Sequence, residues 1–346
     1  MNENREDREI RKIQFTGKSS YTLNIPKKWI EALGIKAGES LLLLKQSDNS
    51  ILLIPSKRFT NKTFEAILKI EREDKEESVI RKLISLYLIG YNYIKILSKD
   101  RLTISQKQSI KETVRRRLMG TEIIEESLNS ITLQVLFKLP ELDIKDALKR
   151  MHLIALSMHR NVLLALEELN YDLAKDVIAM DDEVDRFNFY IIRQLKMTLN
   201  GDIPLKEMGF SSPRDCLGYR IIAKSIERIA DHSVKIANSL LQIKEKLNYG
   251  ILLDLKRLSD LSLKNFEDSM LSLFKRDLNL ADEVINRVKN LHGYGFEIKD
   301  SRNSNLVLIY EGIRRISEYS SDIAEIVINL GIEEFIKKDI ILTKTF

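Results

Sequence analysis

The sequence predicts a mainly α-helical protein in which two tandem three-helix bundles follow a small strand-rich head and a small α/β segment. The chain of 346 residues has only five prolines, and its long stretches rich in Leu, Ile, Glu, Lys and Arg favour helix. Its C-terminal half repeats itself along the sequence, which is typical of duplicated helical units. The N-terminal part instead alternates apolar and polar residues around turn formers, as β-hairpins do.

These patterns divide the chain into five segments. A proline at position 140 interrupts the chain before the long helical stretches, and we place a boundary there. We expect a head, an α/β segment, a first bundle, a second bundle and a C-terminal tail, with the bounds 1–58, 63–140, 141–247, 248–331 and 332–346.

The head is predicted to have the element order ββαββ. Alternation in Ile10–Phe15 and Tyr21–Ile25 indicates one hairpin. Pro26 suits the first turn of a short helix because it lacks only an N–H that would be unpaired there. Leu41–Leu44 and Ile51–Ile54 indicate a second hairpin around a polar turn. About fifty residues cannot bury a sufficient core alone, so we expect the head to form a homodimer.

The runs Arg11–Trp29 and Ala32–Glu39 resemble the AbrB/SpoVT/MazE family of swapped-hairpin barrels. The resemblance implies a dimer of interleaved hairpins that binds DNA through basic residues on one face. Ile30 and Glu31 stand where DNA-binding members often have two arginines, so a head that only dimerises is the alternative. The basic residues that would contact DNA are Arg11, Lys12, Lys18, Lys27 and Lys28.

The net charge of the chain, +5, is concentrated in the head. Residues 1–62 hold twelve Lys or Arg against seven Asp or Glu, and the rest of the chain is balanced. A polyanion would therefore meet the head first. A surplus of this size is also within ordinary variation, so charge alone leaves DNA binding open.

Residues 63–140 alternate between strand and helix patterns. The expected elements are a strand Phe64–Ile70, a helix Val79–Ile89, a strand Tyr93–Leu97, a helix Ser105–Leu118 and a strand pair within Glu122–Phe137. The run Arg115–Arg117 falls on the second of these helices. Consecutive charges on an amphipathic helix usually form a solvated face, so we assign this run no function.

The body contains two copies of a three-helix unit. Met151–Ile178 aligns with Leu258–Ile285 without a gap at an offset of 107, and Ile226–Ala237 aligns with Ile313–Ala324 at an offset of 87. The difference is absorbed by an extra loop, Asn200–Pro213, in the first copy. We therefore expect the first bundle to have the longer helices.

The second helix of the first copy combines an apolar seam with acidic residues. Apolar side chains step by three or four along it, at Leu173, Val177, Met180, Val184, Phe187, Ile191 and Leu195. Asp181 and Asp185 border this seam, and Glu227 and Asp231 form a similar pair on the third helix. Acid pairs on facing helices repel unless a charge compensates them, and a metal ion can do so. The alternative is a solvated face with lysine partners.

The segments Asp181–Asp185 and Ile226–Asn238 resemble the motifs of the PhoU family, and the resemblance covers residues 141–331. It implies a negative regulator of high-affinity phosphate uptake that contacts the phosphate transporter or a sensor kinase. It also implies bound metal ions, namely iron, zinc, manganese or nickel, with the ligands Asp181, Asp185, Glu227 and Asp231. The second copy departs from the motifs, so we expect a metal site in the first bundle only; its corresponding residues are Val288, His292, Arg314 and Glu318.

Other features argue against an enzyme and against export. The chain has four histidines and shows neither a nucleophile motif nor a phosphate-cradling glycine loop. Cys216 is its only cysteine, its N-terminus lacks the apolar core of a signal peptide, and its apolar runs are too short to cross a bilayer. We expect a cytoplasmic, dimeric transcription regulator of phosphate homeostasis. The alternative is an adaptor that docks on a transporter or kinase and uses its head only to dimerise.

Overall fold

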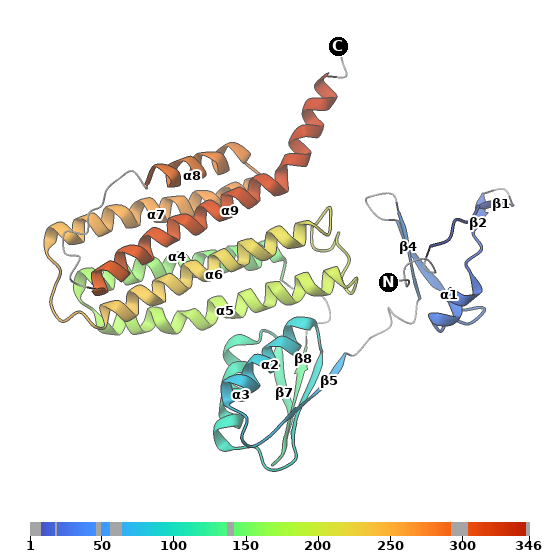
Figure 1. Cartoon of the computed structure of the whole chain (residues 1–346), viewed down its shortest axis with the longest axis horizontal. Helices are drawn as coiled ribbons and strands as arrows, with labels where there is room; N and C mark the ends of the chain where they lie inside the picture. The colour runs from blue at the N-terminus through green and yellow to red at the C-terminus, as the bar shows by residue number, and fades with distance from the viewer. Residues whose placement is uncertain are drawn as a thin grey trace, which may run out of the picture. The chain divides into compact units, whose positions relative to one another are not determined.

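The computed structural model describes residues 8–17, 19–45, 50–55, 64–136, 142–291 and 304–343. They form two compact units, Met1–Lys62 and Thr63–Phe346, which are considered separately below. The first unit is strand-rich and the second is mainly helical (Figure 1). This division confirms the predicted fold class.

The head has the predicted ββαββ order. Its elements are β1 Gln14–Thr16, β2 Ser20–Thr22, α1 Lys27–Ala32, β3 Leu41–Lys45 and β4 Ile51–Pro55. Both hairpins are antiparallel, with Phe15 opposite Tyr21 and Leu43 opposite Leu53. The first hairpin is shorter than predicted, three residues on each strand, and most of the predicted second turn lies outside the described residues. Gly34 ends α1 in the left-handed conformation, with φ of 67°.

The head has almost no interior of its own. Among its described residues only Pro26 is buried, and the two hairpins form separate two-stranded sheets that close no barrel within one chain. Large apolar side chains are correspondingly exposed, including Phe15 at 61% and Leu43 at 62%. A single copy of this segment thus leaves unburied the apolar surface that would normally stabilise a fold.

The α/β module has the predicted elements, with bounds that differ by a few residues. They are β5 Glu65–Ile70, α2 Glu76–Ile89, β6 Tyr93–Ser98, α3 Ile104–Arg117, β7 Thr121–Glu126 and β8 Ser130–Val135. The sheet order is β5-β6-β8-β7, in which β5 and β6 are parallel and the other pairs antiparallel. Leu83 of α2 and Ile110 of α3 share a buried core with Ile96 and Leu133 of the sheet. The two helices therefore cover one face of the sheet.

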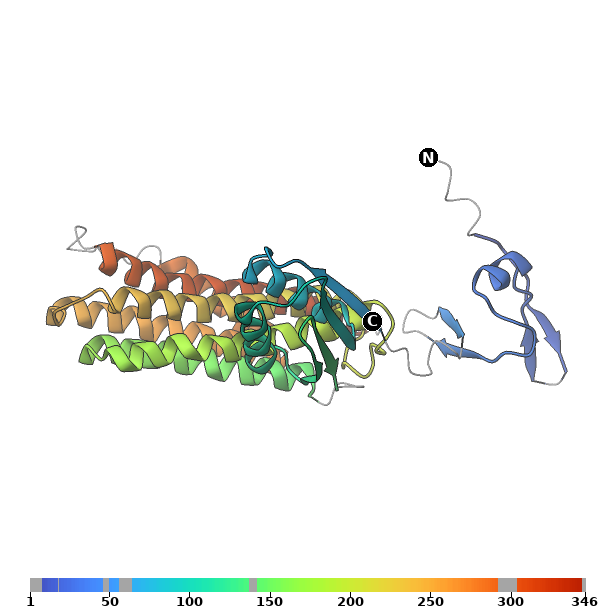
Figure 2. The same cartoon turned by 90° about the horizontal axis from the view of Figure 1, so that it is seen from below.

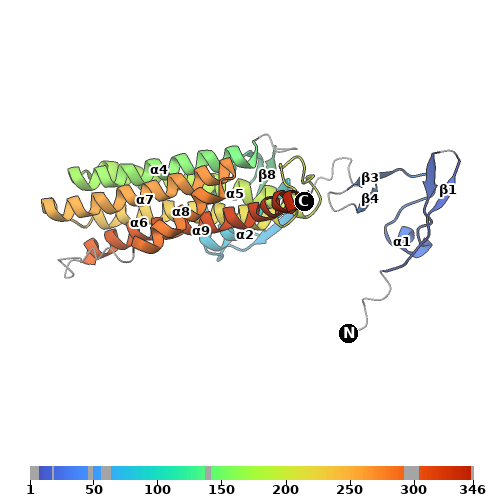
Figure 3. The same cartoon turned by 90° about the horizontal axis from the view of Figure 1, so that it is seen from above.

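Six helices make the body. Their bounds are α4 Ile144–Glu168, α5 Tyr171–Leu199, α6 Asp215–Leu240, α7 Tyr249–Lys275, α8 Leu278–Leu291 and α9 Ser304–Thr343. The first three and the last three correspond to the two predicted copies, and Figures 2 and 3 show their long helices running alongside one another. Only α5 is longer than its counterpart, so the prediction of longer helices throughout the first bundle is wrong. Helix α9 continues through residues 332–343, where a separate tail was predicted.

The two bundles share one hydrophobic core. Helix α6 packs along α9 and α4 along α7, and buried side chains from all six helices form a single cluster. The α6–α9 contact is close: a Cβ atom on Gly312 would lie 2.8 Å from Cγ1 of Ile236. Between α4 and α7, the Nε2 of buried His159 lies 2.8 Å from the hydroxyl of Ser259. The six helices therefore form one body.

Helix α5 contributes its predicted seam to this core. Val177, Val184 and Ile191 are fully buried, and Met180 and Phe187 pack against the same cluster. The helical periodicity of the sequence thus identified correctly the face that α5 turns toward its neighbours.

A different face of α5 carries the α/β module. Phe189 packs into the module's core, and Arg193 reaches the C-terminal end of α2. The buried Arg193 guanidinium donates to the carbonyl oxygens of Gly90 and Tyr91, both at 3.0 Å, and to that of Tyr87. A cation at the C-terminus of a helix can donate hydrogen bonds to carbonyl oxygens that lack an intrahelical partner. It also interacts favourably with the negative end of the helix dipole. Arg193 therefore anchors α2 on the body.

The long helices do not resemble membrane-spanning segments. Within the part of the chain that the structure describes, none combines the length and the apolar character needed to cross a bilayer.

Candidate cation site and candidate nucleic-acid interface

The four predicted ligands lie on two helices that pack against each other. Asp181 and Asp185 are one turn apart on α5, and Glu227 and Asp231 are one turn apart on α6. All four residues are half-buried. On each helix, the two acids lie beside the buried apolar residues. The helical repeat that places those residues in the core therefore places the acids at the edge of the core.

Burial and mutual repulsion raise the pKa values of three of these acids. The pKa of Asp181 rises to about 6, mainly through desolvation and then through the nearby Asp231. That of Asp185 rises to about 7 through desolvation and the negative charge of Asp181. The pKa of Asp231 is also raised, first by desolvation and then by Glu227. Negative charge on α6 therefore contributes to the raised pKa values on α5.

Two basic side chains compensate part of this charge. Arg117, the last residue of α3, places Nε 2.8 Å from Oδ1 of Asp182 and Nη1 3.6 Å from Oδ2 of Asp185. Arg116 adds an ion pair to Asp182 at 3.2 Å. The interpretation of a solvated face holds for Arg115 and Arg116, which are exposed. It is incomplete for Arg117, which pairs with Asp182 and Asp185 because α3 packs against the acidic part of α5.

The second compensating side chain is Lys224, which pairs with Glu227 one turn along α6. Glu227 is half-buried, with 12% of its side chain exposed. Two of the four predicted ligands thus already have a cationic partner supplied by the protein.

The residue types fit a metal ion, but their present side-chain positions do not. Carboxylate oxygens are suitable ligands for borderline divalent ions, and the buried Oδ1 of Asp181 has no hydrogen-bond partner. Nevertheless, no three His, Cys, Asp or Glu side chains among the described residues gather closely enough to hold a metal. A cation would need Asp185 and Glu227 to turn away from Arg117 and Lys224.

In the second bundle, an arginine of the same helix compensates the acidic charge. Val288, at the position of Asp181, is buried and apolar, and His292 lies outside the described residues. Arg314, at the position of Glu227, donates to Glu311 at 2.7 and 3.0 Å and also pairs with Glu318. A covalently fixed guanidinium therefore occupies the equivalent region, as the departure from the motifs predicted.

Three of the five predicted DNA-contacting residues form ion pairs with acidic side chains of the head. Arg11 donates from Nε to Glu9 at 2.9 Å, Lys28 lies 3.8 Å from the same carboxylate, and Lys27 pairs with Glu31 at 3.5 Å. Lys12 is exposed, and Lys18 lies outside the described residues. Exposed ion pairs of this kind contribute at most about 1 kcal/mol, so they can exchange for phosphate contacts.

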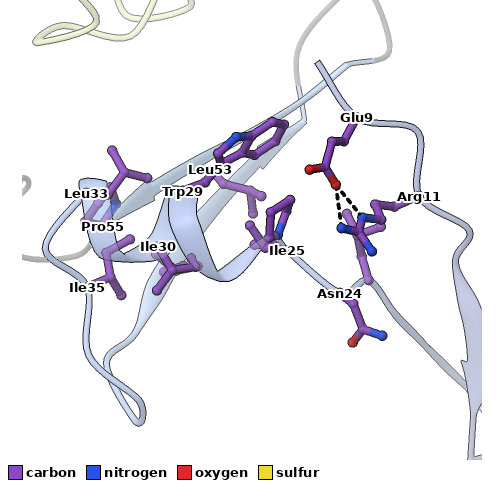
Figure 4. A pocket seen from close by; sticks show the side chains of 13 residues that line it. Glu9, Arg11, Asn24, Ile25, Trp29, Ile30, Leu33, Ile35, Leu53 and Pro55 are labelled. Atoms are coloured by element: carbon purple, nitrogen blue, oxygen red, sulfur yellow. Dashed lines mark hydrogen bonds and ion pairs between the residues drawn. The ribbon is translucent and has the colours of Figure 1, made fainter. Parts of the chain in front are cut away.

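A groove of about 320 Å³ adjoins the Glu9–Arg11 pair in the head (Figure 4). Trp29 and Ile30 of α1 and Leu33, the residue directly after this helix, line the groove together with Leu53 of β4. The labelled side chains in Figure 4 are mostly apolar, with the charged pair at one end. The groove is thus lined mainly by apolar side chains of the kind that form protein cores.

Comparison with known families agrees with both parts of this architecture. Residues 148–240 match the PhoU domain, and residues 14–61 match the domain described as antidote-toxin recognition MazE, bacterial antitoxin. The head is therefore similar to MazE and the first helical bundle to the PhoU domain, which confirms that the two resemblances seen in the sequence fall in these regions. The PhoU match spans α5 and α6 and so includes all four predicted ligands.

Individual relatives are distant. The phosphate-specific transport system accessory protein PhoU homolog 1 of Thermotoga maritima is 25% identical over 211 residues, which are 56% of this chain and 88% of that protein. The crystal structure of the phosphate transport system regulatory protein PhoU from Streptococcus pneumoniae aligns with a TM-score of 0.46 and 18% identity, covering 54% of this chain and 92% of that one. PhoU from Pseudomonas aeruginosa gives 0.45 and 19%, covering 54% and 94%.

Proposed function

We propose that this protein is a dimeric, cytoplasmic regulator of phosphate uptake that acts by binding rather than by catalysis. One observation supports the proposal most directly: the PhoU match includes α5 and α6, the two helices that hold Asp181, Asp185, Glu227 and Asp231. These four residues are called the acidic cluster below. The name of the Thermotoga maritima relative, a phosphate-specific transport system accessory protein, supports the same role. The phosphate transporter or an associated signalling protein is the proposed partner of the body.

The test of this role is phosphate uptake in cells that lack the gene. Loss of a negative regulator should leave uptake of radiolabelled phosphate high when phosphate is abundant, and re-expression of the wild-type chain should restore repression. Uptake that remains repressed in the deletion strain would contradict the proposal.

We propose further that the acidic cluster binds a metal ion, with Asp181, Asp185, Glu227 and Asp231 as ligands and iron, zinc, manganese or nickel as the candidates. The orphaned Oδ1 of Asp181 and the raised pKa values support this, because both indicate carboxylates that lack sufficient positive charge. The bound ion would supply that charge and link α5 to α6.

The head is proposed to be the dimerisation element. Its exposed apolar side chains and its apolar groove need a covering surface, and a second copy of the same segment has the matching chemistry. Leu43→Asp should therefore convert the full-length dimer to a monomer in analytical ultracentrifugation. Ile67→Asp, which changes an equally exposed apolar residue of the α/β sheet, is the matched control and should leave the dimer intact. A wild-type monomer would contradict the proposal.

The proposed output of the head is DNA binding. Arg11, Lys12, Lys18, Lys27 and Lys28 would contact phosphates, and each Lys or Arg replaced by Ala should lower the slope of log affinity against log salt by about one unit. The measurement is a gel shift with chromosomal fragments at several salt concentrations. Unchanged affinity in Arg11→Ala, Lys12→Ala and Lys18→Ala would remove the proposed surface.

The partial neutralisation of these residues favours a second candidate. Because Glu9 and Glu31 pair with Arg11, Lys28 and Lys27, the head can also be a dimerisation element alone, with the body acting as an adaptor on a transporter or kinase. The gel shift separates the two: a dimer that shifts no chromosomal fragment at low salt is the adaptor.

A further inference from the structure

We propose that two copies of this chain pair through the free edge of β5, antiparallel and centred on Ile67, so that two four-stranded sheets join into one. This contact goes beyond the dimer proposed for the head, because it joins the α/β modules as well. It rests on that dimer only in that the heads keep the two chains together. The α/β module thereby becomes a second surface for self-association.

Strand β5 lies at one edge of its sheet, and that edge is open. In the order β5-β6-β8-β7 it pairs with β6 alone, and Figure 1 shows it at the margin of the module. On its outer side, its backbone N–H and C=O groups meet no other strand among the described residues. Such a row of backbone groups is a template for pairing with a further strand. The edge can therefore accept one.

The opposite edge of the sheet has features that prevent such pairing. Strand β7 shifts its register between Ile123 and Glu125, and the exposed Glu122 and Glu125 give it negative charge. Bulges and charges of one sign keep edge strands from pairing. Strand β5, in contrast, runs in regular register beside β6 over six residues and contains neither a bulge nor a proline. Of the two edges, β5 is thus the one open to a partner.

The exposed side chains of β5 match those of a second copy of the same strand. Glu65, Ile67 and Lys69 alternate along the face that α2 and α3 leave uncovered. In an antiparallel pair centred on Ile67, each Glu65 lies opposite Lys69 of the partner subunit, and the two Ile67 side chains lie opposite each other. Neither Glu65 nor Lys69 forms an ion pair with another described residue. The strand is therefore complementary in charge to its own copy.

The covered face of β5 restricts the register to this arrangement. Leu68 packs against the core beneath α2 and α3, and centring on Ile67 sets the small Ala66 opposite Leu68 of the partner subunit. A shift by one residue would turn the covered face of one sheet toward the uncovered face of the other. A shift by two would place Ile67 opposite a charged residue and lose both charge pairs. One register thus satisfies both faces.

The contact is small, which explains why it depends on the head. Six residues of strand bury less surface than a stable dimer needs. Only residues 56–64 separate β4 from β5, a reach of at most about 30 Å. Chains that dimerise through their heads therefore hold their β5 strands at a high effective concentration. For the same reason Ile67→Asp, which breaks the β5 pair, leaves the chains dimeric.

The test is disulfide cross-linking of the full chain that carries Ile67→Cys. Residues opposite each other at the centre of an antiparallel pair lie within the Cα separation of a disulfide, so mild oxidation should convert most chains to a covalent dimer on a non-reducing gel. Ile124→Cys, which changes another exposed isoleucine of the same sheet on β7, is the matched control and should stay largely monomeric on that gel. Wild type gives the baseline, because Cys216 is buried.

A charge swap separates this pairing from chance collision. In the Ile67→Cys background, Glu65→Lys puts two lysines opposite each other at both ends of the pair, and cross-linking should slow on the order of tenfold. Lys69→Glu should slow it to a similar extent. Glu65→Lys combined with Lys69→Glu makes the charges opposite again and should restore the rate of Ile67→Cys alone.

The outcomes separate the β5 pair from the head dimer. Cross-linking through position 67 but not 124, with rescue by the charge swap, supports the β5 pair. A dimer in analytical ultracentrifugation that does not cross-link through position 67 overturns it and leaves the head dimer standing. Equal cross-linking through both positions, or failure of the combined variant to restore the rate, overturns it as well. A monomer that does not cross-link overturns both.

Discussion

The two copies of the helical unit compensate half-buried acidic charge in different ways. In the second bundle, Arg314 lies on the same helix as Glu311 and Glu318 and pairs with both. In the first bundle, Lys224 pairs with Glu227 on the same helix, but the guanidinium near Asp185 belongs to Arg117 of the α/β module. A positive charge built into the helix is permanent, whereas one supplied by another module can be exchanged.

This difference explains why only the first bundle is a candidate cation site. Arg314 occupies the position of Glu227 in the first copy. It replaces a possible ligand, and its own positive charge compensates the neighbouring acids without a metal ion. The first copy keeps four acids, three of them with raised pKa values.

The largest expected effect on stability is that of chelation. If a metal bridges α5 and α6, removing it with EDTA should lower the melting temperature of the full chain by about 5 °C, which corresponds to binding at roughly one hundred times the dissociation constant. Asp181→Ala with Glu227→Ala should melt at the same temperature with and without EDTA. Glu318→Ala, the equivalent change in the second bundle, should keep the full wild-type response.

The pH dependence of the metal-free protein should differ between the two bundles. Because the folded-state pKa values of Asp181 and Asp185 are raised to about 6 and 7, the folded state holds protons that the unfolded chain has lost, and stability falls as pH rises from about 4 to 8. Asp185→Asn should be about 2 kcal/mol more stable than wild type at pH 8 and nearly equal to it at pH 4, measured by urea unfolding.

The second bundle should show the opposite sign. The Arg314 hydrogen bond lowers the pKa of Glu311, so the stability that this carboxylate contributes is present at neutral pH and lost as pH falls through that lowered value. Glu311→Gln should therefore lose stability relative to wild type at pH 7 but not at pH 3. If the free energy of unfolding of Asp185→Asn and of Glu311→Gln, each relative to wild type, changed with pH in the same way, the two bundles would not differ in how they compensate acidic charge.

The smallest expected effect is that of removing the internal guanidinium. Arg314→Met should cost about 0.5–1 kcal/mol in urea unfolding, because its ion pairs are partly exposed and Arg315 also contacts both acids. It should leave Mn²⁺ affinity in the first bundle unchanged. A loss of several kcal/mol would mean that the second bundle depends on its arginine far more than its exposure indicates.

Periodicity and repetition were sufficient to predict the body. The seam from Leu173 to Leu195 follows the helical repeat, and the offsets between the copies located the helices before any packing was known. The lengths of the second-copy helices were mispredicted because the repeat stops before α9 does.

The contacts of the α/β module with α5 could not be predicted in the same way. Arg117 meets Asp182 across 65 positions of sequence, and no local pattern records such a pairing. Arg193 did leave a signal, a charged residue within the buried stretch Tyr190–Leu195, which indicates a buried partner without naming it. Tertiary contacts thus decided that Arg117, unlike the exposed Arg115 and Arg116, pairs with a predicted ligand, Asp185.

The prediction that the first bundle alone binds metal is tested most directly by elemental analysis of three proteins purified without chelator. Wild type and Glu318→Ala should carry the same amount of iron, zinc, manganese or nickel per chain, and Asp181→Ala with Glu227→Ala should carry none. Absence of metal from the wild type, or metal retained by the double variant, would show that the four acids are neutralised only by the protein's own basic residues.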